Sequence, residues 1–512
     1  MPANVREVTI RRTVGLDAYR AVAGAEPMLG DLAELGAELA HLLGPRRVWM
    51  LNSTAVGGGV AEMLPKLCDL LNCLGVDTRW LVLEPDDPAF FRVTKALHNL
   101  LHGESGLEDV GAARAIYDRV SREAAARLRE KVVSDDLLVV HDPQPAGAAA
   151  LIPAEHRPAL LWRSHIGLSY SNEATRRGWA FLRDYLSAYQ RLVFSAEGYI
   201  PEEHLPRSAV LHPGIDPLSH KNRELRPYKL VGVLRASGLL EGPPVPNWAR
   251  FGNQASRFEG GRWVRAPIPG LLHAPVLLQV SRFDRLKGFQ HLIPAFERLI
   301  AQGPSVSQRL RVDTERAASE LGCVQLVLAG PDPQGVSDDP EAAQVLEELC
   351  ERHRALPGPL AARVHLVRLS MADVRENALA VNALQRVAAA VLQNSLKEGF
   401  GLTVAEALWK RTPVIAANVG GLGVQVRHGT DGLLVNDPAD PGEISEAMLR
   451  MLAFPKDAER MACAGQLRVR DHFLILSQLR RWLEELRTMV EAPARATEPA
   501  QPGVAAAPPQ LH

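Results

Sequence analysis

Both halves of this 512-residue chain contain a short apolar run that is followed by glycines and then by a helical pattern. In the first half, residues 48–51 lead to the glycines at 57–59, and leucines then recur at helical spacing. In the second half, residues 390–392 lead to a glycine-rich turn at 399–401, and residues 403–410 have the pattern of a helix. Strands that alternate with helices are typical of parallel sheets, because a crossover must return each strand in the same direction. The pattern therefore predicts two α/β domains, each built on a parallel sheet.

Length and composition are those of a multidomain globular protein, with 46% apolar and 23% charged residues. The 58 basic and 59 acidic side chains give a formal net charge of -1, which disfavours nucleic acid as a partner. The five cysteines are scattered and form no CxxC pair, so neither a disulfide framework nor a zinc site is expected. The sequence has no apolar run of membrane-spanning length and no signal-peptide core at its start. We therefore expect a cytoplasmic protein with no membrane partner.

Changes in pattern divide the chain into five segments. Residues 1–220 and 272–455 are expected to form the two α/β domains. Residues 221–271 lack strand–helix alternation and are expected to be a linker with an insertion of unassigned fold. Apolar side chains at helical spacing predict terminal helices over 456–490, which cross back to the first domain. The Pro- and Ala-rich segment 491–512 is expected to be disordered.

Polar residues follow several predicted strands of the first domain. Asp142 comes after the strand at 137–140, and His165 comes after the strand at 160–162. Ligands of open parallel sheets lie beyond the carboxyl ends of the strands. Either residue alone is more often structural, but two at successive strand ends favour a position in a ligand cleft. The glycines at 57–59 stand at a similar strand end, where they allow close approach of a ligand, although a flexible surface loop has the same composition.

The turn at 399–401 is a candidate phosphate site. The helix that follows it begins with free N–H groups and the positive end of its dipole. Glu398 precedes the turn and Glu406 lies about one helical turn after it, and carboxylates accept hydrogen bonds from sugar hydroxyls. Each has a simpler interpretation, since Thr403 and Glu406 match a capping box and Glu398 could be a solvated loop residue.

Arg282 and Lys287 follow the predicted strand at 276–280 and are expected to face the same crevice as the glycine turn. An arginine binds phosphate oxygens bidentately, and a lysine adds a compact charge. Such cations are more often solvated surface charges. Together with the glycine turn, however, they predict a diphosphate site that stabilises negative charge on a leaving group. No DxD-like carboxylate pair stands at a comparable strand end, so we expect neither a metal nor a cofactor.

These motifs resemble those of retaining glycosyltransferases of glycosyltransferase family 4, which have the GT-B fold. Arg282 with Lys287, and the pair Glu398-x7-Glu406, carry this likeness. Further segments are similar to the nucleotide-glucose-dependent trehalose synthases within that group: 51–64, 90–103, 139–147, 160–169, 211–222 and 381–410. The likeness covers most of residues 20–490, but neither 228–270 nor the tail.

The resemblance implies two Rossmann-like domains that face each other across a cleft, with the acceptor in the first, the nucleotide sugar in the second, and a C-terminal helix. It implies transfer of glucose from ADP-glucose or UDP-glucose to glucose, with retention, to form α,α-trehalose. The partners would then be the nucleotide-sugar donor, which is a substrate and not a cofactor, and the glucose acceptor. The C-terminal helix and the habit of the family allow a homodimer.

The resemblance also implies roles for individual residues. Arg282 and Lys287 would bind the diphosphate, Glu406 the ribose, and Glu398 the donor glucose. The implied catalytic residues are His165, Asp142, Arg282, Lys287 and Glu398. The implied donor-binding and phosphate-binding residues are Gly57, Gly58, Gly59, Arg282, Lys287, Gly399, Phe400, Gly401, Leu402, Thr403 and Glu406.

Two alternatives stay open at this point. A retaining trehalose phosphorylase on the same fold would bind inorganic phosphate with the same cations. A GT-B nucleotide-sugar isomerase or a non-catalytic sugar-binding protein would keep its affinity for nucleotides without transferring a sugar. No sequence motif separates adenine from uracil as the base of the donor.

Overall fold

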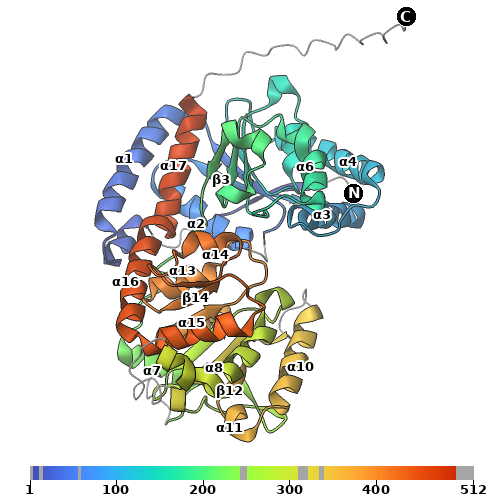
Figure 1. Ribbon diagram of the computed structural model, residues 1–512. Coiled ribbons are helices and arrows are strands. Elements are labelled where there is room, and N and C mark those ends of the chain that lie inside the picture. The colour runs from blue at the N-terminus through green and yellow to red at the C-terminus, as the bar shows by residue number, and fades with distance from the viewer. Residues whose placement is uncertain are drawn as a thin grey trace, which may run out of the picture.

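The computed structural model of the protein describes residues 4–10, 15–55, 59–242, 251–309, 321–333 and 340–491. Two α/β domains are stacked on each other, and the last two helices run along one side of both (Figure 1). Within the described ranges, no helix combines the length and apolarity needed to cross a membrane. The predicted glycines 57 and 58 and the tail from residue 492 lie outside the described residues.

The first sheet has seven strands within the described residues, in the order β1-β3-β2-β4-β5-β6-β7. The strands are β1 (Asn4–Val8), β2 (Val48–Asn52), β3 (Thr78–Glu84), β4 (Leu137–His141), β5 (Ala159–Ser164), β6 (Arg191–Phe194) and β7 (Ser208–Val210). Only β1 is antiparallel to its neighbour among these strands. The strand order reverses direction between β2 and β4, and such a switch point is where open α/β sheets bind ligands.

Helices cover both faces of the first sheet, which explains why β2 and β4 are buried along their whole length. One face packs against helices with these bounds: α3 (Pro88–Leu101), α4 (Val110–Arg129), α5 (Ala146–Ala150) and α6 (Glu173–Leu186). The other face packs against α1 (Glu26–Leu43), α2 (Gly59–Cys73) and α17 (Ile475–Glu491).

The second sheet has eight strands within the described residues, in the order β15-β14-β13-β10-β11-β12-β8-β9. Its bounds are β8 (Ser256–Glu259), β9 (Arg262–Val264), β10 (Val276–Val280), β11 (Gln325–Pro331), β12 (Val364–Leu369), β13 (Ala390–Gln393), β14 (Val414–Ala417) and β15 (Leu433–Val435). The six strands from β10 to β15 are parallel and have the Rossmann order, with its switch point between β10 and β13.

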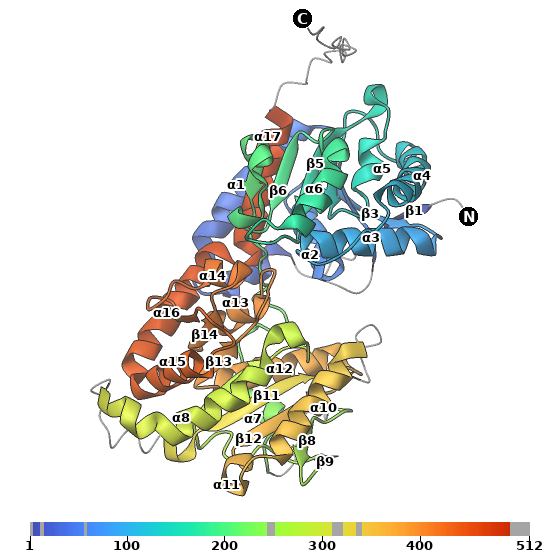
Figure 2. The same cartoon turned by 45° about the vertical axis from the view of Figure 1, so that its right-hand side comes forward.

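Helices again lie on both faces of this sheet, so that its core forms two apolar layers. Their bounds are α7 (Pro227–Ala236), α8 (Phe289–Arg309), α10 (Pro340–Arg354), α11 (Gly358–Ala361), α12 (Val374–Val387), α13 (Leu402–Trp409), α14 (Gly420–Gln425), α15 (Pro441–Ala453) and α16 (Pro455–His472). Of these, α13 and α14 lie nearest the first domain in both views (Figure 2).

Part of the segment interpreted from the sequence as a linker with an insertion belongs to the second sheet. β8 pairs antiparallel with β12 and with β9, so 256–264 is a hairpin at the sheet edge. Gly260 and Gly261 form its turn with φ values of 57° and 81°, which a two-residue hairpin loop of the common type requires. Strand–helix alternation is absent here because two antiparallel strands need no crossover helix. Residues 243–250 lie outside the described residues.

The chain crosses between the domains twice, and the two crossings lie side by side. The Ile215 N–H donates to the Phe473 carbonyl at 2.8 Å, and the Ile475 N–H donates to the Ile215 carbonyl at 2.9 Å. A Cβ on Gly214 would lie 2.7 Å from the Leu474 carbonyl carbon, so this contact depends on glycine. After the crossing, α17 packs against α1 of the first domain, next to an ion pair of 2.7 Å between Arg191 and Glu485. The two connections between the domains are thus hydrogen-bonded to each other.

Candidate active site

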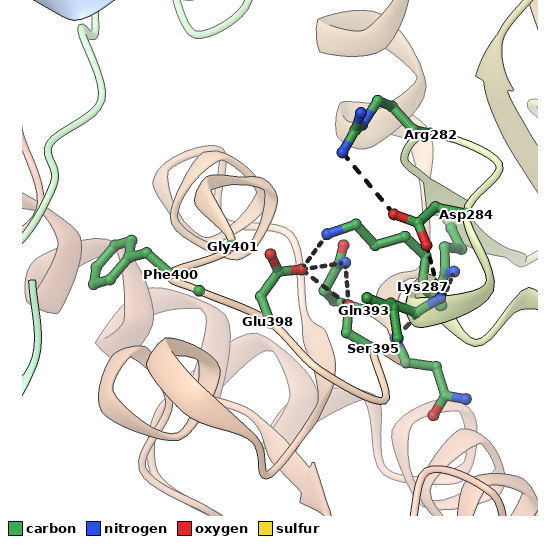
Figure 3. A network of polar contacts seen from close by, with 12 residues as sticks. Arg282, Asp284, Lys287, Gln393, Ser395, Glu398, Phe400 and Gly401 are labelled. Atoms are coloured by element: carbon green, nitrogen blue, oxygen red, sulfur yellow. Dashed lines mark hydrogen bonds and ion pairs between the residues drawn. The ribbon is translucent and has the colours of Figure 1, made fainter. Parts of the chain in front are cut away.

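The strand order of the second sheet brings the predicted charged loops together. β10 and β13 are neighbours, and their loops lead to helices on either side of the switch point. Lys287 lies on the loop after β10, and Glu398 lies on the loop after β13. The Lys287 Nζ is 2.6 Å from the Glu398 Oε2, and the two side chains are only 17% and 11% exposed (Figure 3).

The Glu398 carboxylate is held by further hydrogen bonds from its own loop. The Ser395 Oγ donates to the Glu398 Oε2 at 2.9 Å, and the Gln393 Nε2 donates to the same oxygen at 3.3 Å (Figure 3). The position of the carboxylate is therefore defined by side chains as well as by the ion pair. The Glu398 carboxylate would therefore already be oriented when it contacts a ligand.

A buried glutamine inside β10 connects the two loops. The Gln279 Nε2 donates to the Lys287 carbonyl at 2.8 Å, and the Asn394 N–H donates to the Gln279 Oε1 at 2.9 Å. A direct backbone bond adds to this link, from the Leu396 N–H to the Leu286 carbonyl at 2.7 Å. Sequence reasoning missed Gln279 and the equivalent Gln393 of β13. A detectable signal was an amide side chain within an otherwise apolar strand, where an unpaired polar group would be unfavourable.

Arg282 stands on the same loop as Lys287, but it reaches farther into solvent. Its side chain is 58% exposed, and its Nη2 lies 3.9 Å from the Asp284 Oδ2 (Figure 3). Asp284 also accepts the Leu286 N–H at 2.8 Å and so begins the short 3₁₀ turn Arg285–Lys287. The structure thus joins Lys287 to Glu398 and leaves the guanidinium of Arg282 at the rim of the same loop.

Helix α13 begins with a glycine in the left-handed region. Gly401 has φ of 76°, and a Cβ there would lie 2.4 Å from Leu422 Cδ2 and 2.9 Å from Glu398 Cγ. The capping box considered as an alternative for Thr403 and Glu406 does not form, because the helix already begins at Leu402, after Gly401 as its N-cap. The first turn consequently lacks a side-chain cap, and its amides are suited to an anion.

Glu406 lies on the buried side of α13 and is 7% exposed. Its Oε1 is 3.6 Å from the Nζ of Lys221, a residue of the interdomain connection. Its backbone carbonyl accepts a hydrogen bond of 2.9 Å from the Nζ of Lys410. Glu406 is therefore close to two cations other than Lys287, one turn away from the start of the helix.

The glycine turn also packs tightly against the rest of the protein. The Tyr199 hydroxyl of the first domain donates to the Gly399 carbonyl, which also accepts the Gly421 N–H at 2.9 Å. The Phe400 side chain is buried and stacks on His212, with ring centroids 5.9 Å apart. Phe400 can therefore contact a ligand only through its backbone.

Polar residues at the carboxyl ends of β4 and β5 in the first domain contact each other. The His141 Nδ1 lies 2.9 Å from the His165 Nε2, and the two rings are stacked at 5.2 Å. The His165 backbone N–H donates to the Asp142 Oδ1 at 2.8 Å. Asp142 adopts φ of 65°, a left-handed conformation that is uncommon outside glycine and often marks functional sites. Sequence reasoning selected Asp142 and His165 but missed His141, although it directly precedes Asp142.

Burial controls the charges of this cluster. It lowers the pKa of His141 to about 3 and the pKa of His165 well below its usual range, and the nearby Arg163 guanidinium lowers both further. Burial raises the pKa of Asp142 to about 6, although the His165 N–H and Arg163 oppose this. At neutral pH the cluster therefore presents two neutral imidazoles and one carboxylate.

A cavity of about 310 Å³ lies beyond the carboxyl ends of β2 and β3. Its lining combines the Phe90 and Phe91 rings of α3 with polar side chains, among which are Thr54 and Gln144. Gln144 stands two residues after Asp142, so the cavity and the histidine–aspartate cluster lie at the same edge of the sheet. An aromatic wall with a few hydroxyl and amide groups is suited to a sugar-sized polar ligand. Of the three predicted glycines, Gly59 begins α2 nearby, and the other two lie outside the described residues.

Comparisons with known proteins agree with this architecture. The family models "Trehalose synthase, N-terminal domain" and "Glycosyl transferases group 1" match residues 50–201 and 375–468. The trehalose synthase of Pyrococcus horikoshii is 32% identical over 475 residues, 93% of this chain and 96% of that protein. The trehalose phosphorylase of Pleurotus pulmonarius is 25% identical over 491 residues, 91% of this chain and 60% of that protein.

A similar fold also occurs among solved structures. The alpha,alpha-trehalose-phosphate synthase (UDP-forming) from Burkholderia vietnamiensis superposes with a TM-score of 0.61 at 16% identity. The match covers 88% of this chain and all of that one. The GT-B fold expected from the sequence, with two parallel-sheet domains and C-terminal helices, is confirmed.

Proposed function

We propose that this chain, which belongs to the trehalose synthase family of glycosyltransferases, moves glucose from a nucleotide-glucose to glucose and forms α,α-trehalose. The observation that carries the proposal is the meeting of Lys287, Glu398 and the uncapped start of α13 at one switch point. These groups combine a cation and backbone donors for phosphate with a carboxylate for sugar hydroxyls.

In this proposal the diphosphate of the donor lies between Lys287 and the start of α13. The bond between the anomeric carbon and the phosphate oxygen breaks, and negative charge accumulates on the diphosphate. Lys287 and the helix amides stabilise that charge, and the exposed Arg282 side chain reaches the outer phosphate. Protein groups would thus stabilise the negative charge of the leaving group, and no metal is required. The UDP-forming activity in the name of the Burkholderia protein supports a nucleotide-linked donor.

The acceptor glucose is proposed to occupy the cavity beside Asp142 and Gln144. Its anomeric hydroxyl attacks the donor carbon from the face that the diphosphate leaves, so that the configuration is retained. The proton of that hydroxyl passes to the departing phosphate oxygen. Neutral His165 and ionised Asp142 orient sugar hydroxyls, and Glu398 holds the donor glucose. In this proposal Glu406 binds the ribose of the nucleotide.

The experiment that tests this proposal combines ADP-glucose, UDP-glucose and other nucleotide-glucoses with glucose and with glucose 6-phosphate. Chromatography measures the disaccharide and the released nucleotide, with and without EDTA. Trehalose and nucleoside diphosphate in equal amounts, unchanged by EDTA, are expected. Absence of both products with every donor would contradict the proposal.

A phosphorylase is the second candidate, because the phosphorylase relative covers 91% of this chain and the same cations could bind inorganic phosphate. Release of glucose phosphate from trehalose that depends on phosphate and ignores nucleotides would select it. Nucleotide binding without transfer to any acceptor would select the isomerase or the non-catalytic protein.

A further inference from the structure

A second cavity, of about 500 Å³, lies where the two domains join. Residues 21–24, before α1, and residues 217–218, after the first sheet, form its first-domain side. Residues 409–411, which end α13, and side chains of α16 form the other side. The start of α13 belongs to the candidate donor site, and its end belongs to this cavity. The two sites are thus at opposite ends of one helix.

The lining of this cavity is strongly positive. Among the described residues that line it, Glu224 is the one carboxylate, and the cations are Arg223, Arg386, Lys410, Arg411 and Arg470. Arg470 is bonded to Asp471 at 2.7 Å, outside the lining. The remaining positive charge exceeds that of the single glutamate.

The cations nearest α13 bond to neutral oxygens. The Lys410 Nζ donates to the Asn222 Oδ1 at 3.1 Å and to the Glu406 carbonyl at 2.9 Å, although Lys410 is only 7% exposed. The Arg411 Nε donates to the Gln466 Oε1 at 2.6 Å. Buried charges are normally paired, so this arrangement is favourable to an anion in the cavity. Burial lowers the pKa of Lys410 to about 7, although the nearby Glu406 carboxylate opposes this shift, and a bound anion would favour the charged form further.

The backbone of Arg411 supports the same interpretation. Arg411 stands one residue after Lys410, the C-cap of α13, and has φ of 57°, a position that glycine usually occupies at helix ends. A cation near the end of a helix also offsets the negative end of its dipole. That role is already met by Lys410, whose Nζ donates to a carbonyl of the last turn. A second cation in a strained conformation beside a cavity points to a ligand.

We propose that this interdomain cavity binds a small phosphorylated compound, either inorganic phosphate or a sugar phosphate. Guanidinium groups match phosphate oxygens in geometry, and four of the five lining cations are arginines. The volume accommodates a hexose phosphate, and the half-buried Trp409 supplies a surface for a sugar ring. Because both domains line the cavity, its ligand favours one arrangement of the domains. Donor and phosphate affinities would then change each other by the same factor.

Calorimetric titration with inorganic phosphate and with glucose 6-phosphate, at constant ionic strength, tests the proposal without any need for catalysis. The informative variant is Arg223→Gln/Arg411→Gln, since both side chains are exposed, and thermal unfolding checks that the variant is folded. The control is Arg122→Gln/Arg127→Gln on α4, which removes the same charge from exposed positions of the first domain. Lys287→Ala serves as the variant of the donor site.

We expect phosphate binding to weaken by about tenfold or more in Arg223→Gln/Arg411→Gln, and to persist in Lys287→Ala and in the control. Tighter binding of glucose 6-phosphate than of inorganic phosphate would assign the ligand as a sugar phosphate, and equal binding would assign it as phosphate alone. Loss in Lys287→Ala with retention in Arg223→Gln/Arg411→Gln would place the phosphate in the donor site and overturn the proposal. Absence of binding to the unmodified protein, or equal weakening in the control, would overturn it as well.

Discussion

Lys287 and Glu398 are 111 residues apart in the chain, yet their charged atoms lie 2.6 Å from each other. They meet because β10 and β13 are adjacent parallel strands whose connections leave the sheet on either side of a switch point. The pair is mostly buried. Ser395 donates a hydrogen bond to the Glu398 carboxylate, and Gln279 donates one to the Lys287 carbonyl. The cation therefore has a fixed position, and in the proposed reaction this would limit reorganisation as charge develops on the diphosphate.

Lys287→Ala is expected to lower kcat by about 10²–10³-fold, because one charge-stabilising donor is lost at the diphosphate. The melting temperature should also fall, because Glu398 loses its cation while it stays mostly buried and keeps only its bonds from Ser395 and Gln393. Steady-state kinetics and thermal unfolding measure the two effects. Arg285→Ala is the matched control, because Arg285 is exposed and pairs with Glu348 away from the site. Unchanged kcat in Lys287→Ala would remove the assigned role, and Arg282→Ala should reduce turnover in the same direction.

Glu406→Ala is expected mainly to raise the KM for the donor, with a smaller effect on kcat. The proposed ribose contact would be present in both the ground state and the transition state, so its loss should affect binding more than the chemical step. Initial rates over a range of donor concentrations separate the two constants. Lys221→Met, which removes the cation 3.6 Å from Glu406 but no ribose contact, should leave the donor KM nearly unchanged. Equal rises in both variants would indicate that the ion pair, and not the ribose contact, sets the donor affinity.

The pH dependence of activity should reflect Asp142, whose pKa burial raises from 3.8 to about 6. If the carboxylate accepts hydrogen bonds from sugar hydroxyls, kcat/KM should fall by about tenfold for each pH unit below 6. Asp142→Asn should have low activity without this dependence. A pH profile of that variant that still bends near 6 would assign the titration to another group.

The same pKa gives a prediction for stability. Because the folded protein binds this proton more tightly than the unfolded chain, the ionised carboxyl destabilises the fold, and increasingly so as the pH rises from about 4 to 6. Asp142→Asn should therefore raise the melting temperature more at pH 8 than at pH 4. Melting curves at both pH values test this, and a larger gain at the lower pH would contradict it.

Two glycines of the donor region are expected to respond differently to alanine. A Cβ at Gly421 would lie 2.5 Å from Phe400 Cα, whereas a Cβ at Gly399 has nothing within 4 Å. Gly421→Ala should therefore lower both the melting temperature and kcat by displacing the turn that begins α13. Gly399→Ala should keep the melting temperature, and it should raise the donor KM if the donor sugar occupies that space. Equal melting temperatures for the two variants would contradict this account of the packing.

Local features of this protein could be predicted from its amino-acid order. Apolar runs that end in glycines or polar residues identified parallel strands of both sheets, but not the antiparallel strands β1, β8 and β9. The residues that follow those runs pointed to Asp142, His165, Lys287 and Glu398. Such predictions succeed because the polarity of a side chain sets which local period can be buried. The same reasoning missed Gln279, whose purpose is visible only when the two loops it joins are seen together.

The tertiary structure decided which of these segments meet. The strand order brings Lys287 to Glu398, buries Phe400 against His212, and makes 256–264 an edge hairpin of the second sheet. It also begins α13 at Leu402, so that no capping box forms there. These outcomes depend on contacts between residues tens to hundreds of positions apart. No single stretch of sequence contains them, because the free energy of packing is a sum over partners that only the complete fold brings into contact.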